Sequence, residues 1–286
     1  MSPRRNARAT VTLRPATRGK TRALGQHFLR DDGVARRLVE LITPTPRDLV
    51  VEIGPGRGAL TGLLASAGAC LVALEVDPAL ATGLRERFAE SDHVKILAAD
   101  ARAFAYAGLR ARLPDPRGGR VLVAGNLPYS VGKPILMALV EAGRAIDEMA
   151  LMLQKEVALR VAAAPGSKIY GSLSVLTQIA CEASLAFTVP PAAFSPPPQV
   201  DSAVIHLRVR SAPPVPIGDV TRFRAVVRAA FGQRRKSLAN ALAAGLGLAT
   251  ERARTLVTAA GLDPGRRAET LSLAEFARLA EMFQAP

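Results

Sequence analysis

The 286-residue chain has few of the residues that build metal sites and disulfide frameworks. It contains two cysteines, three histidines and no tryptophan. Scattered histidines without a Cys/His cluster argue against a structural zinc site. Cys70 and Cys181 lie in apolar surroundings, which is typical of buried thiols in a reducing cytosol. No apolar run approaches the roughly 20 residues that span a bilayer. We therefore expect a cytoplasmic protein that uses no metal and no membrane.

Acidic residues are scarce as well, and the excess of basic residues is uneven. The chain has 38 Lys+Arg against 24 Asp+Glu, a net charge of +14. Residues 1–30 hold 8 basic residues and no acid, and residues 218–286 carry a net +5, whereas residues 31–217 carry only +1. Basic ends around a nearly neutral centre favour a polyanion partner such as nucleic acid. The alternative is an arginine-rich, solvated surface.

Composition divides the chain into four parts. Residues 1–20 are Arg-rich without periodicity and are expected to form a disordered tail. Residues 21–210 read as one domain, and the Pro-rich stretch 211–217, SAPPVPI, reads as a linker. Residues 218–286 read as a small all-helical domain that binds RNA. Its helices are expected over 220–231, 237–244, 250–260 and 273–283.

Alternating strands and helices in the first domain predict a Rossmann-like α/β fold, with a mostly parallel sheet and helices on both faces. Strands are expected over 49–53, 70–76, 94–98, 121–124, 149–153 and 203–209, the last of them antiparallel. Asp32 is expected to cap the first helix. Gly54, Gly56 and Gly58 form a turn at which the backbone can approach a ligand closely. The spacing G-x-G-x-G differs from the dinucleotide pattern, so hydride chemistry is weakly supported.

Acidic residues stand at or just after the ends of three of these strands. Glu52 stands before the first glycine. Glu75 lies 21 residues after Gly54, where a carboxylate can accept hydrogen bonds from ribose hydroxyls. Asp77 precedes Pro78 and is expected to cap a helix instead. Asp100 can accept from the exocyclic amine of a cofactor's adenine. Any one of these acids could be a simple loop carboxylate, but three at successive strand ends indicate a nucleoside cofactor.

The buried strand before Asn126 ends in the sequence Asn126, Leu127, Pro128 and Tyr129. The Asn126 amide oxygen and the Leu127 carbonyl are two acceptors side by side. Together they can accept both hydrogens of an aromatic amine and make its nitrogen more tetrahedral and nucleophilic. Tyr129 offers a flat face on which a base can stack. The alternative is a plain Asn-x-Pro turn after a strand.

The Asn-Leu-Pro-Tyr sequence resembles the catalytic motif of adenine-N6 methyltransferases that use S-adenosylmethionine (SAM). Across nearly its whole length the chain resembles the ribosomal RNA adenine dimethyltransferases. The segments that carry this resemblance are GQHFL (25–29), QKEV (154–157), YGSLSV (170–175), FSPPPQVDS (194–202) and FGQRRKSL (231–238).

The resemblance implies roles for individual residues. Catalytic positions would be Asn126, Leu127, Pro128, Tyr129 and Phe194. Cofactor contacts would come from His27, Leu29, Glu52, Gly54, Gly56, Glu75, Asp100 and Asn126. Phosphates of rRNA would be held by Arg234, Arg235 and Lys236. His27 is a departure, because the family more often has Asn there. Phe194 would help to sandwich the target base, although a buried core Phe is the alternative.

The resemblance also implies a reaction. A monomeric enzyme would transfer two methyl groups from SAM to N6 of each of two adjacent adenosines. These lie in a loop near the 3′ end of small-subunit rRNA, in the pre-30S particle, so the reaction is linked to small-subunit maturation. The main alternative is an Erm-type enzyme that modifies large-subunit rRNA and confers macrolide resistance. YGSLSV and the ending over 266–276 favour the small subunit. A nicotinamide oxidoreductase and a non-catalytic assembly factor fit the motifs less well.

Overall fold

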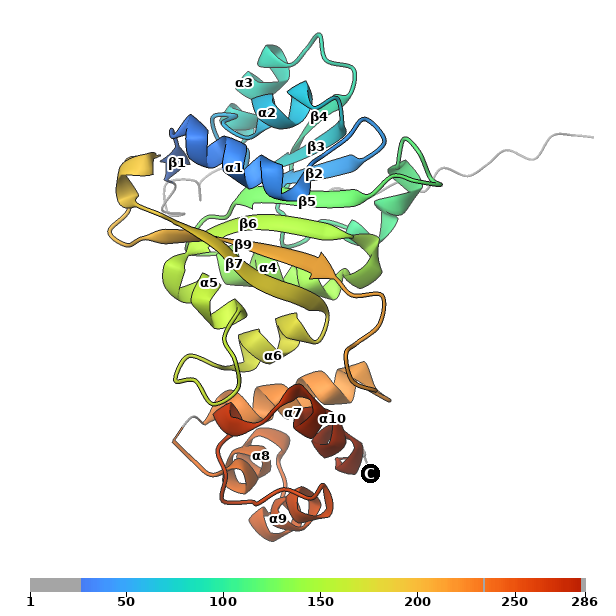
Figure 1. Cartoon of the computed structure of the whole chain (residues 1–286), viewed down its shortest axis with the longest axis vertical. Coiled ribbons are helices and arrows are strands. Elements are labelled where there is room, and N and C mark those ends of the chain that lie inside the picture. The colour runs from blue at the N-terminus through green and yellow to red at the C-terminus, as the bar shows by residue number, and fades with distance from the viewer. Residues whose placement is uncertain (1–26, 234, 284–286) are drawn as a thin grey trace, which may run out of the picture.

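The computed structural model describes residues 27–233 and 235–283. The expected tail over 1–20, the start of the first domain and Arg234 lie outside the described residues. The molecule is elongated, with a sheet-containing part at one end and a group of helices at the other (Figure 1). In the described part of the chain, no helix is both long and apolar enough to span a membrane.

A seven-stranded sheet forms the centre of the larger part. Its strands are β2 (Leu49–Ile53), β3 (Cys70–Glu75), β4 (Val94–Ala98), β5 (Val121–Asn126), β6 (Glu148–Gln154), β7 (Cys181–Val189) and β9 (Ser202–Val209). The spatial order is β4-β3-β2-β5-β6-β9-β7. β2 to β6 pair in parallel, and β9 is antiparallel to both β6 and β7, as expected for the closing strand. The sequence pattern does not predict β7, because a register shift between Leu185 and Phe187 interrupts its alternation.

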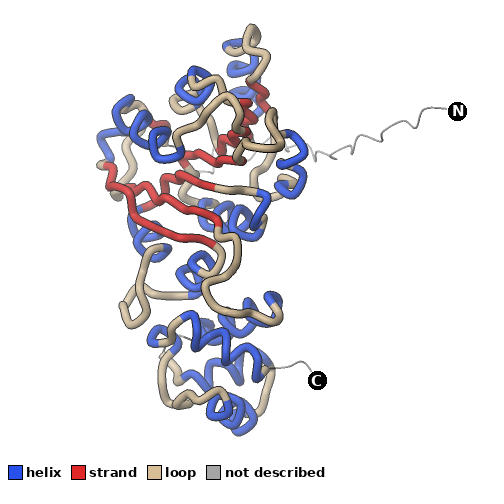
Figure 2. Tube along the Cα trace, turned by 45° about the vertical axis from the view of Figure 1, so that its right-hand side comes forward, coloured by secondary structure: helices blue, strands red, loops and turns tan. Residues whose placement is uncertain are grey.

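Helices cover both faces of the sheet, which confirms the predicted fold class (Figures 1 and 2). One face carries α1 (Asp32–Ile42), α2 (Thr61–Ser66) and α3 (Pro78–Arg87), and the other carries α4 (Gly132–Glu141), α5 (Lys155–Val161) and α6 (Ser172–Gln178). Neighbouring residues of β2 show the division. Val50 packs in the cluster that contains α1 and α2, whereas Val51 packs in the cluster that contains α4 and α5. Successive side chains of a strand point to opposite faces, so the apolar run of β2 is buried on both sides.

Helix caps decide where the first-face helices begin. Asp31, not Asp32, caps α1: its Oδ1 accepts N–H bonds from Gly33 at 2.9 Å and Val34 at 3.1 Å. The cap is the last residue with extended backbone before the helix, and Asp31 has that conformation, whereas Asp32 is already helical. Asp77 caps α3 by accepting from Ala79 at 2.8 Å, which confirms its expected role.

The C-terminal helices are α7 (Val220–Gly232), α8 (Leu238–Leu246), α9 (Thr250–Ala259) and α10 (Leu273–Met282). Their apolar cluster includes Phe223 and Phe276, but also Tyr170 and Ile179, which lie on either side of α6. Glu141 at the end of α4 forms ion pairs with two arginines of α7. The helices are therefore packed onto the sheet-containing part, and the expected bounds of 21–210, 211–217 and 218–286 stay a prediction.

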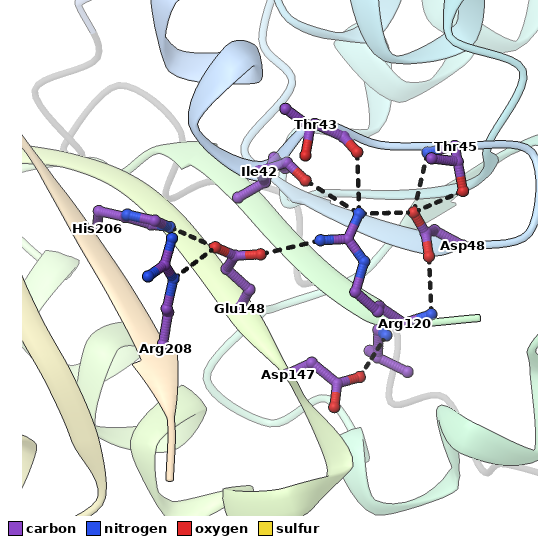
Figure 3. A network of polar contacts seen from close by, with 10 residues as sticks. Ile42, Thr43, Thr45, Asp48, Arg120, Asp147, Glu148, His206 and Arg208 are labelled. Carbon is purple, nitrogen blue, oxygen red and sulfur yellow. Dashed lines mark hydrogen bonds and ion pairs between the residues drawn. The ribbon is translucent and has the colours of Figure 1, made fainter. Parts of the chain in front are cut away.

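An ion-pair network lies where β2, β5 and β6 begin, at the amino edge of the parallel strands (Figure 3). The Arg120 guanidinium donates to Asp48 at 3.0 Å and to Glu148 at 3.1 Å. It also donates to the Thr43 carbonyl at 2.9 Å. Glu148 additionally accepts from His206 at 2.6 Å and from Arg208 at 3.2 Å on β9. These bonds fasten the starts of neighbouring strands to one another.

Candidate active site

The expected site residues gather at the opposite, carboxyl edge of the sheet. β2 lies between β3 and β5, and Ile53 at its end pairs with Leu74 and with Gly125. The connections leave β2 and β5 in opposite directions, toward β3 and β4 on one side and toward β6 on the other. Ligands bind in the crevice that such a reversal of strand order creates. The glycine turn, Glu75 and Asn126 all flank this point.

The glycine turn that follows β2 needs glycine at its tightest places. Gly54 and Gly56 have φ angles of +65° and +57°, a left-handed conformation that other residues rarely adopt. A Cβ on Gly56 would also lie 3.0 Å from the Phe28 ring. The Arg57 guanidinium also lies over that ring, 4.6 Å from its centre. Phe28 therefore closes the turn from outside, a contact that the sequence motif does not reveal.

Glu75 at the end of β3 holds the glycine turn in place. Its Oε2 accepts the Gly56 N–H at 2.9 Å, and its Oε1 accepts the Asp77 N–H at 3.0 Å. Burial raises the pKa of Glu75, and the two N–H bonds oppose that rise. A carboxylate keeps further acceptor lone pairs after two hydrogen bonds. Glu75 can therefore both shape the turn and accept from ribose hydroxyls.

Glu52 lies beneath the same turn and is only 1% exposed. Its Oε2 forms no hydrogen bond within the described part of the chain. Burial, with a smaller contribution from the charge of Glu75, raises the pKa of Glu52 to about 8. The carboxyl group is therefore neutral at pH 7 and carries a proton that it can donate. An orphaned buried polar atom is unusual in a native protein and indicates a ligand or a water partner.

A two-stranded sheet brings two distant segments to this edge. β1 (Phe28–Leu29) pairs antiparallel with β8 (Phe194–Ser195), so that Leu29 stands opposite Phe194. His27 extends this connection, because its Nδ1 lies 2.8 Å from the Pro196 carbonyl. The structure thus places His27 and Leu29 next to the motif that contains Phe194. Only tertiary structure could join segments about 165 residues apart.

Asn126 ends β5, and its side chain is oriented by this added segment. Its Nδ2 donates to the His27 carbonyl at 2.9 Å. An amide whose nitrogen is fixed in this way directs its oxygen elsewhere. Among the described residues, no group donates a hydrogen bond to the Asn126 Oδ1. The acceptor that the proposed chemistry needs is therefore free to receive an incoming N–H.

The rest of the motif is held by the neighbouring strands. The Leu127 N–H donates to the Met152 carbonyl of β6 at 3.0 Å, and the Leu127 side chain is buried. Tyr129 is half-buried, and its hydroxyl forms a hydrogen bond with the hydroxyl of Ser202 at the start of β9. The His27 ring lies 5.4 Å from the Tyr129 ring, centre to centre. These contacts fix the Tyr129 ring plane at the carboxyl edge.

Phe194 lies beside these residues but deeper than expected. Its side chain is 1% exposed and belongs to the apolar cluster of α1 and the sheet. In the described conformation the ring is covered. Its role in sandwiching a base stays a prediction, and that role requires the ring to become accessible when substrate binds.

Asp100, which follows β4, is already engaged. Both of its carboxylate oxygens accept from the Arg102 side chain, and Oδ1 also accepts the Arg102 N–H at 2.9 Å. The Arg102 guanidinium lowers the pKa of Asp100. An adenine amine would have to share these oxygens with Arg102, a competition that the sequence did not indicate. The part of the chain that is described contains no cluster of three His, Cys, Asp or Glu side chains suited to a metal.

The expected RNA-binding residues lie far from this edge in sequence, in the turn between α7 and α8. Arg235 and Lys236 are exposed there, and the Lys236 N–H donates to the Gln233 carbonyl at 3.0 Å. Arg234 lies outside the described residues. In Figure 1 this turn and β1 lie toward the same side of the molecule.

Known proteins are similar to this chain over most of its length. A relative from Methylococcus capsulatus, named ribosomal RNA small subunit methyltransferase A, is 45% identical over 255 residues, which cover 89% of this chain and 94% of the relative. The solved structure of the 23S rRNA methyltransferase ErmE has a TM-score of 0.65 at 26% identity, covering 89% of this chain and 98% of that one. A dimethyladenosine transferase from Plasmodium falciparum shares the fold, with a TM-score of 0.70 at 20% identity over 88% of this chain and 96% of that one.

A family model described as ribosomal RNA adenine dimethylase matches residues 18–285. That range includes the glycine turn, Asn126, Phe194 and the turn between α7 and α8. The expected resemblance is thereby confirmed: this chain belongs to the ribosomal RNA adenine dimethylase family.

Proposed function

We propose that this chain uses SAM to transfer two methyl groups to N6 of each of two adjacent adenosines near the 3′ end of small-subunit rRNA, in the pre-30S particle. The orientation of Asn126 carries this proposal. Its Nδ2 is bound to the His27 carbonyl, and no group in the described part of the chain donates to its Oδ1 at the carboxyl edge beside the glycine turn. An open, preorganised acceptor at this place suits an aromatic amine.

The residues around the glycine turn fit SAM as the cofactor. Gly56 lets the backbone approach a ligand, and Glu75 offers further acceptor capacity to ribose hydroxyls. Glu52 adds a buried carboxyl group under the turn, and its Oε2 has no hydrogen-bond partner among the described residues. When bound, SAM supplies a methyl group that its sulfonium already activates, so the protein needs only to position the acceptor nitrogen. The glycine backbone, the Glu75 carboxylate and the buried Glu52 carboxyl group thus lie around one candidate cofactor site.

The Asn-Leu-Pro-Tyr motif would act on the target amine. The Asn126 Oδ1 and the Leu127 carbonyl accept its two hydrogens, which localises the nitrogen lone pair. Tyr129 stacks on the base and fixes its plane. To reach these groups the adenine has to leave its stack, which an unpaired loop permits at low cost. After transfer, the methylated nitrogen loses its proton readily to water, so no strong general base is required.

The degree of similarity supports small-subunit rRNA as the substrate. The relative named for the small subunit is 45% identical, whereas ErmE, named for 23S rRNA, is 26% identical. Both similarities extend over 89% of this chain, so the difference does not come from a missing domain. The exposed Arg235 and Lys236 would hold RNA phosphates, because the central domain has little net charge of its own.

Primer extension on both rRNAs tests the proposal. Purified enzyme and SAM are added to unmethylated small and large ribosomal subunits. Two methyl groups on N6 block Watson–Crick pairing, so reverse transcriptase should stop at two adjacent positions near the 3′ end of small-subunit rRNA. Mass spectrometry should identify dimethyladenosine there. Stops confined to large-subunit rRNA would support the Erm-type alternative instead.

A further inference from the structure

A second cavity lies between the sheet-containing part and the C-terminal helices, apart from the residues described above. It has a volume of about 140 Å³. Its wall combines basic and apolar side chains from α4, α5, the α5–α6 loop and α7. Lys133, Arg160, Ile169, Tyr170, Ser172 and Phe231 are among the lining residues.

The charge of this cavity points to an anion. Lys133 and Arg160 line it, and among the described residues no Asp or Glu does. Within the described chain the exposed Lys133 ammonium forms no hydrogen bond or ion pair. Arg160 pairs with Glu156 on the same helix, an exposed contact of the kind that contributes little stability and that a phosphate can replace.

The apolar wall points to a flat group. Ile169 is 39% exposed, although the burial of an Ile side chain is favourable. Phe231 lies edge-on to Tyr170 with ring centres 6.0 Å apart, and both rings line the cavity. A cavity of about 150 Å³ accommodates one aromatic ring such as benzene. The volume and the rings therefore suit a single unstacked base, with its phosphate toward the cations.

The position of the cavity connects the two sites already described. Lys133 follows Tyr129 by four residues and stands at the start of α4, at the carboxyl edge of the sheet. Phe231 precedes the basic Arg235 by the same number of residues in α7 and the turn that follows it. In Figure 1 the α5–α6 loop lies between the sheet and the α7–α8 turn. RNA that reaches both sites would pass over the cavity.

We propose that this cavity binds one unpaired nucleotide of the RNA substrate, outside the site of methyl transfer. The base packs against Ile169 and Phe231, and its phosphate pairs with Lys133 and Arg160. The inference rests on the proposed function, because it takes RNA as the ligand. It adds a contact that selects RNAs with an extruded nucleotide at a fixed distance from the target adenosine.

Crosslinking tests which molecule occupies the cavity. Ile169 is replaced by the photoreactive p-benzoylphenylalanine, and the enzyme is irradiated with unmethylated small ribosomal subunits. The expected product is a crosslink to rRNA at one or two neighbouring nucleotides. The matched control carries the same group at Met282, which is 37% exposed at the far end of α10. A crosslink to a ribosomal protein, or one no stronger than the control, would overturn the proposal.

Kinetics tests whether the contact matters. Lys133→Ala and Ile169→Asp should each raise the KM for small subunits about tenfold, as the loss of a phosphate contact or a base stack does. In both variants the kcat and the SAM affinity should stay within about twofold of the wild-type values. In the control Met282→Asp, the KM, the kcat and the SAM affinity should all stay within that range. An unchanged KM in both variants would refute the nucleotide site and leave the proposed function intact. If the wild-type enzyme forms no dimethyladenosine, the proposed function fails instead.

Discussion

Asp48, directly before β2, and Glu52, near the end of β2, are buried carboxyl groups at opposite edges of the sheet, and each is 1% exposed. Asp48, at the amino edge, accepts from Arg120 and from Thr45. Burial alone would raise its pKa, but these hydrogen bonds hold the pKa below its ordinary value. Glu52, at the carboxyl edge, has one oxygen without a partner in the part of the chain that is described, and burial raises its pKa to about 8.

The different bonding of these two acids indicates that the amino edge of the sheet has a structural role and the carboxyl edge a functional one. Acids at the amino edge have cationic partners that keep them charged and connect the strands (Figure 3). At the carboxyl edge, backbone N–H groups hold Glu75, and Glu52 has one oxygen without a partner in the described chain, so both keep capacity for a ligand. Asp100 is the exception at this edge, because Arg102 pairs with it. Strained or unsatisfied groups tend to persist where function requires them. Five substitutions can test this contrast.

The largest effect is expected on turnover at the carboxyl edge. Asn126→Ala removes an acceptor that acts mainly in the transition state, so single-turnover methylation should fall about a hundredfold or more, on the order of 2–4 kcal/mol. SAM affinity by calorimetry and the unfolding midpoint in urea should change little. Asn240→Ala, on an exposed position of α8, is the matched control. Near-normal turnover would remove Asn126 from the catalytic role.

The next effect is expected on stability at the amino edge. Arg120→Met leaves Asp48 and Glu148 without their shared cation. Removal of one partner from a buried network is costly, and we expect a loss of about 2–3 kcal/mol, since Arg120 itself is partly exposed. Urea unfolding measures this loss, and Arg112→Ala, an exposed arginine of η3 (Arg110–Arg112), is the control. SAM affinity of the folded variant should be unchanged; a large decrease would contradict the separation of the two edges.

A smaller effect, on pH dependence, is expected at Glu52. The pKa is about 8 in the folded state and near 4.5 in the unfolded state. Between these values the unfolded chain has released a proton that the folded chain keeps, so wild-type stability falls as pH rises. Glu52→Gln should therefore be more stable than wild type above pH 8, by about 1–2 kcal/mol, and similar near pH 4. Parallel stability curves for the two proteins would refute the raised pKa.

Asp48→Asn provides the comparison of opposite sign. Because the folded-state pKa of Asp48 is lowered, the charged group stabilises the protein above about pH 4, and this contribution is lost as pH falls further. The variant should be less stable than wild type at pH 7, and the difference should shrink in acid. If Glu52→Gln and Asp48→Asn both changed the stability at high pH in the same direction, the two edges would not differ as we infer.

The smallest effect is expected at Asp100. Arg102 occupies both carboxylate oxygens, but its side chain is half exposed, and such pairs contribute less than about 1 kcal/mol. Arg102→Ala should therefore increase SAM affinity by no more than about fivefold, if Asp100 accepts from the adenine amine. Calorimetry measures this change, and Arg112→Ala again serves as the control. A weaker affinity would mean that Arg102 supports the cofactor and does not compete with it.

Local patterns in the sequence were sufficient for much of the fold. Apolar runs predicted six of the seven strands of the sheet, and the glycine spacing located the turn after β2. Asp77 was identified as a cap because Pro78 follows it. β7 was missed because its bulge breaks the alternation. The cap of α1 was wrongly placed at Asp32 instead of Asp31, because either carboxylate can cap a helix that begins nearby.

The sequence by itself determined which residue types stand at the ends of the strands, since the chain order and the length of each apolar run decide where a strand stops. Tertiary structure decided what those residues touch. The β1–β8 pairing orients Asn126 through the His27 carbonyl, the Arg102 side chain pairs with Asp100, and Tyr170 is buried in the apolar cluster of the C-terminal helices. Such contacts join positions far apart in sequence or depend on side-chain rotamers, and neither leaves a periodic signal along the chain.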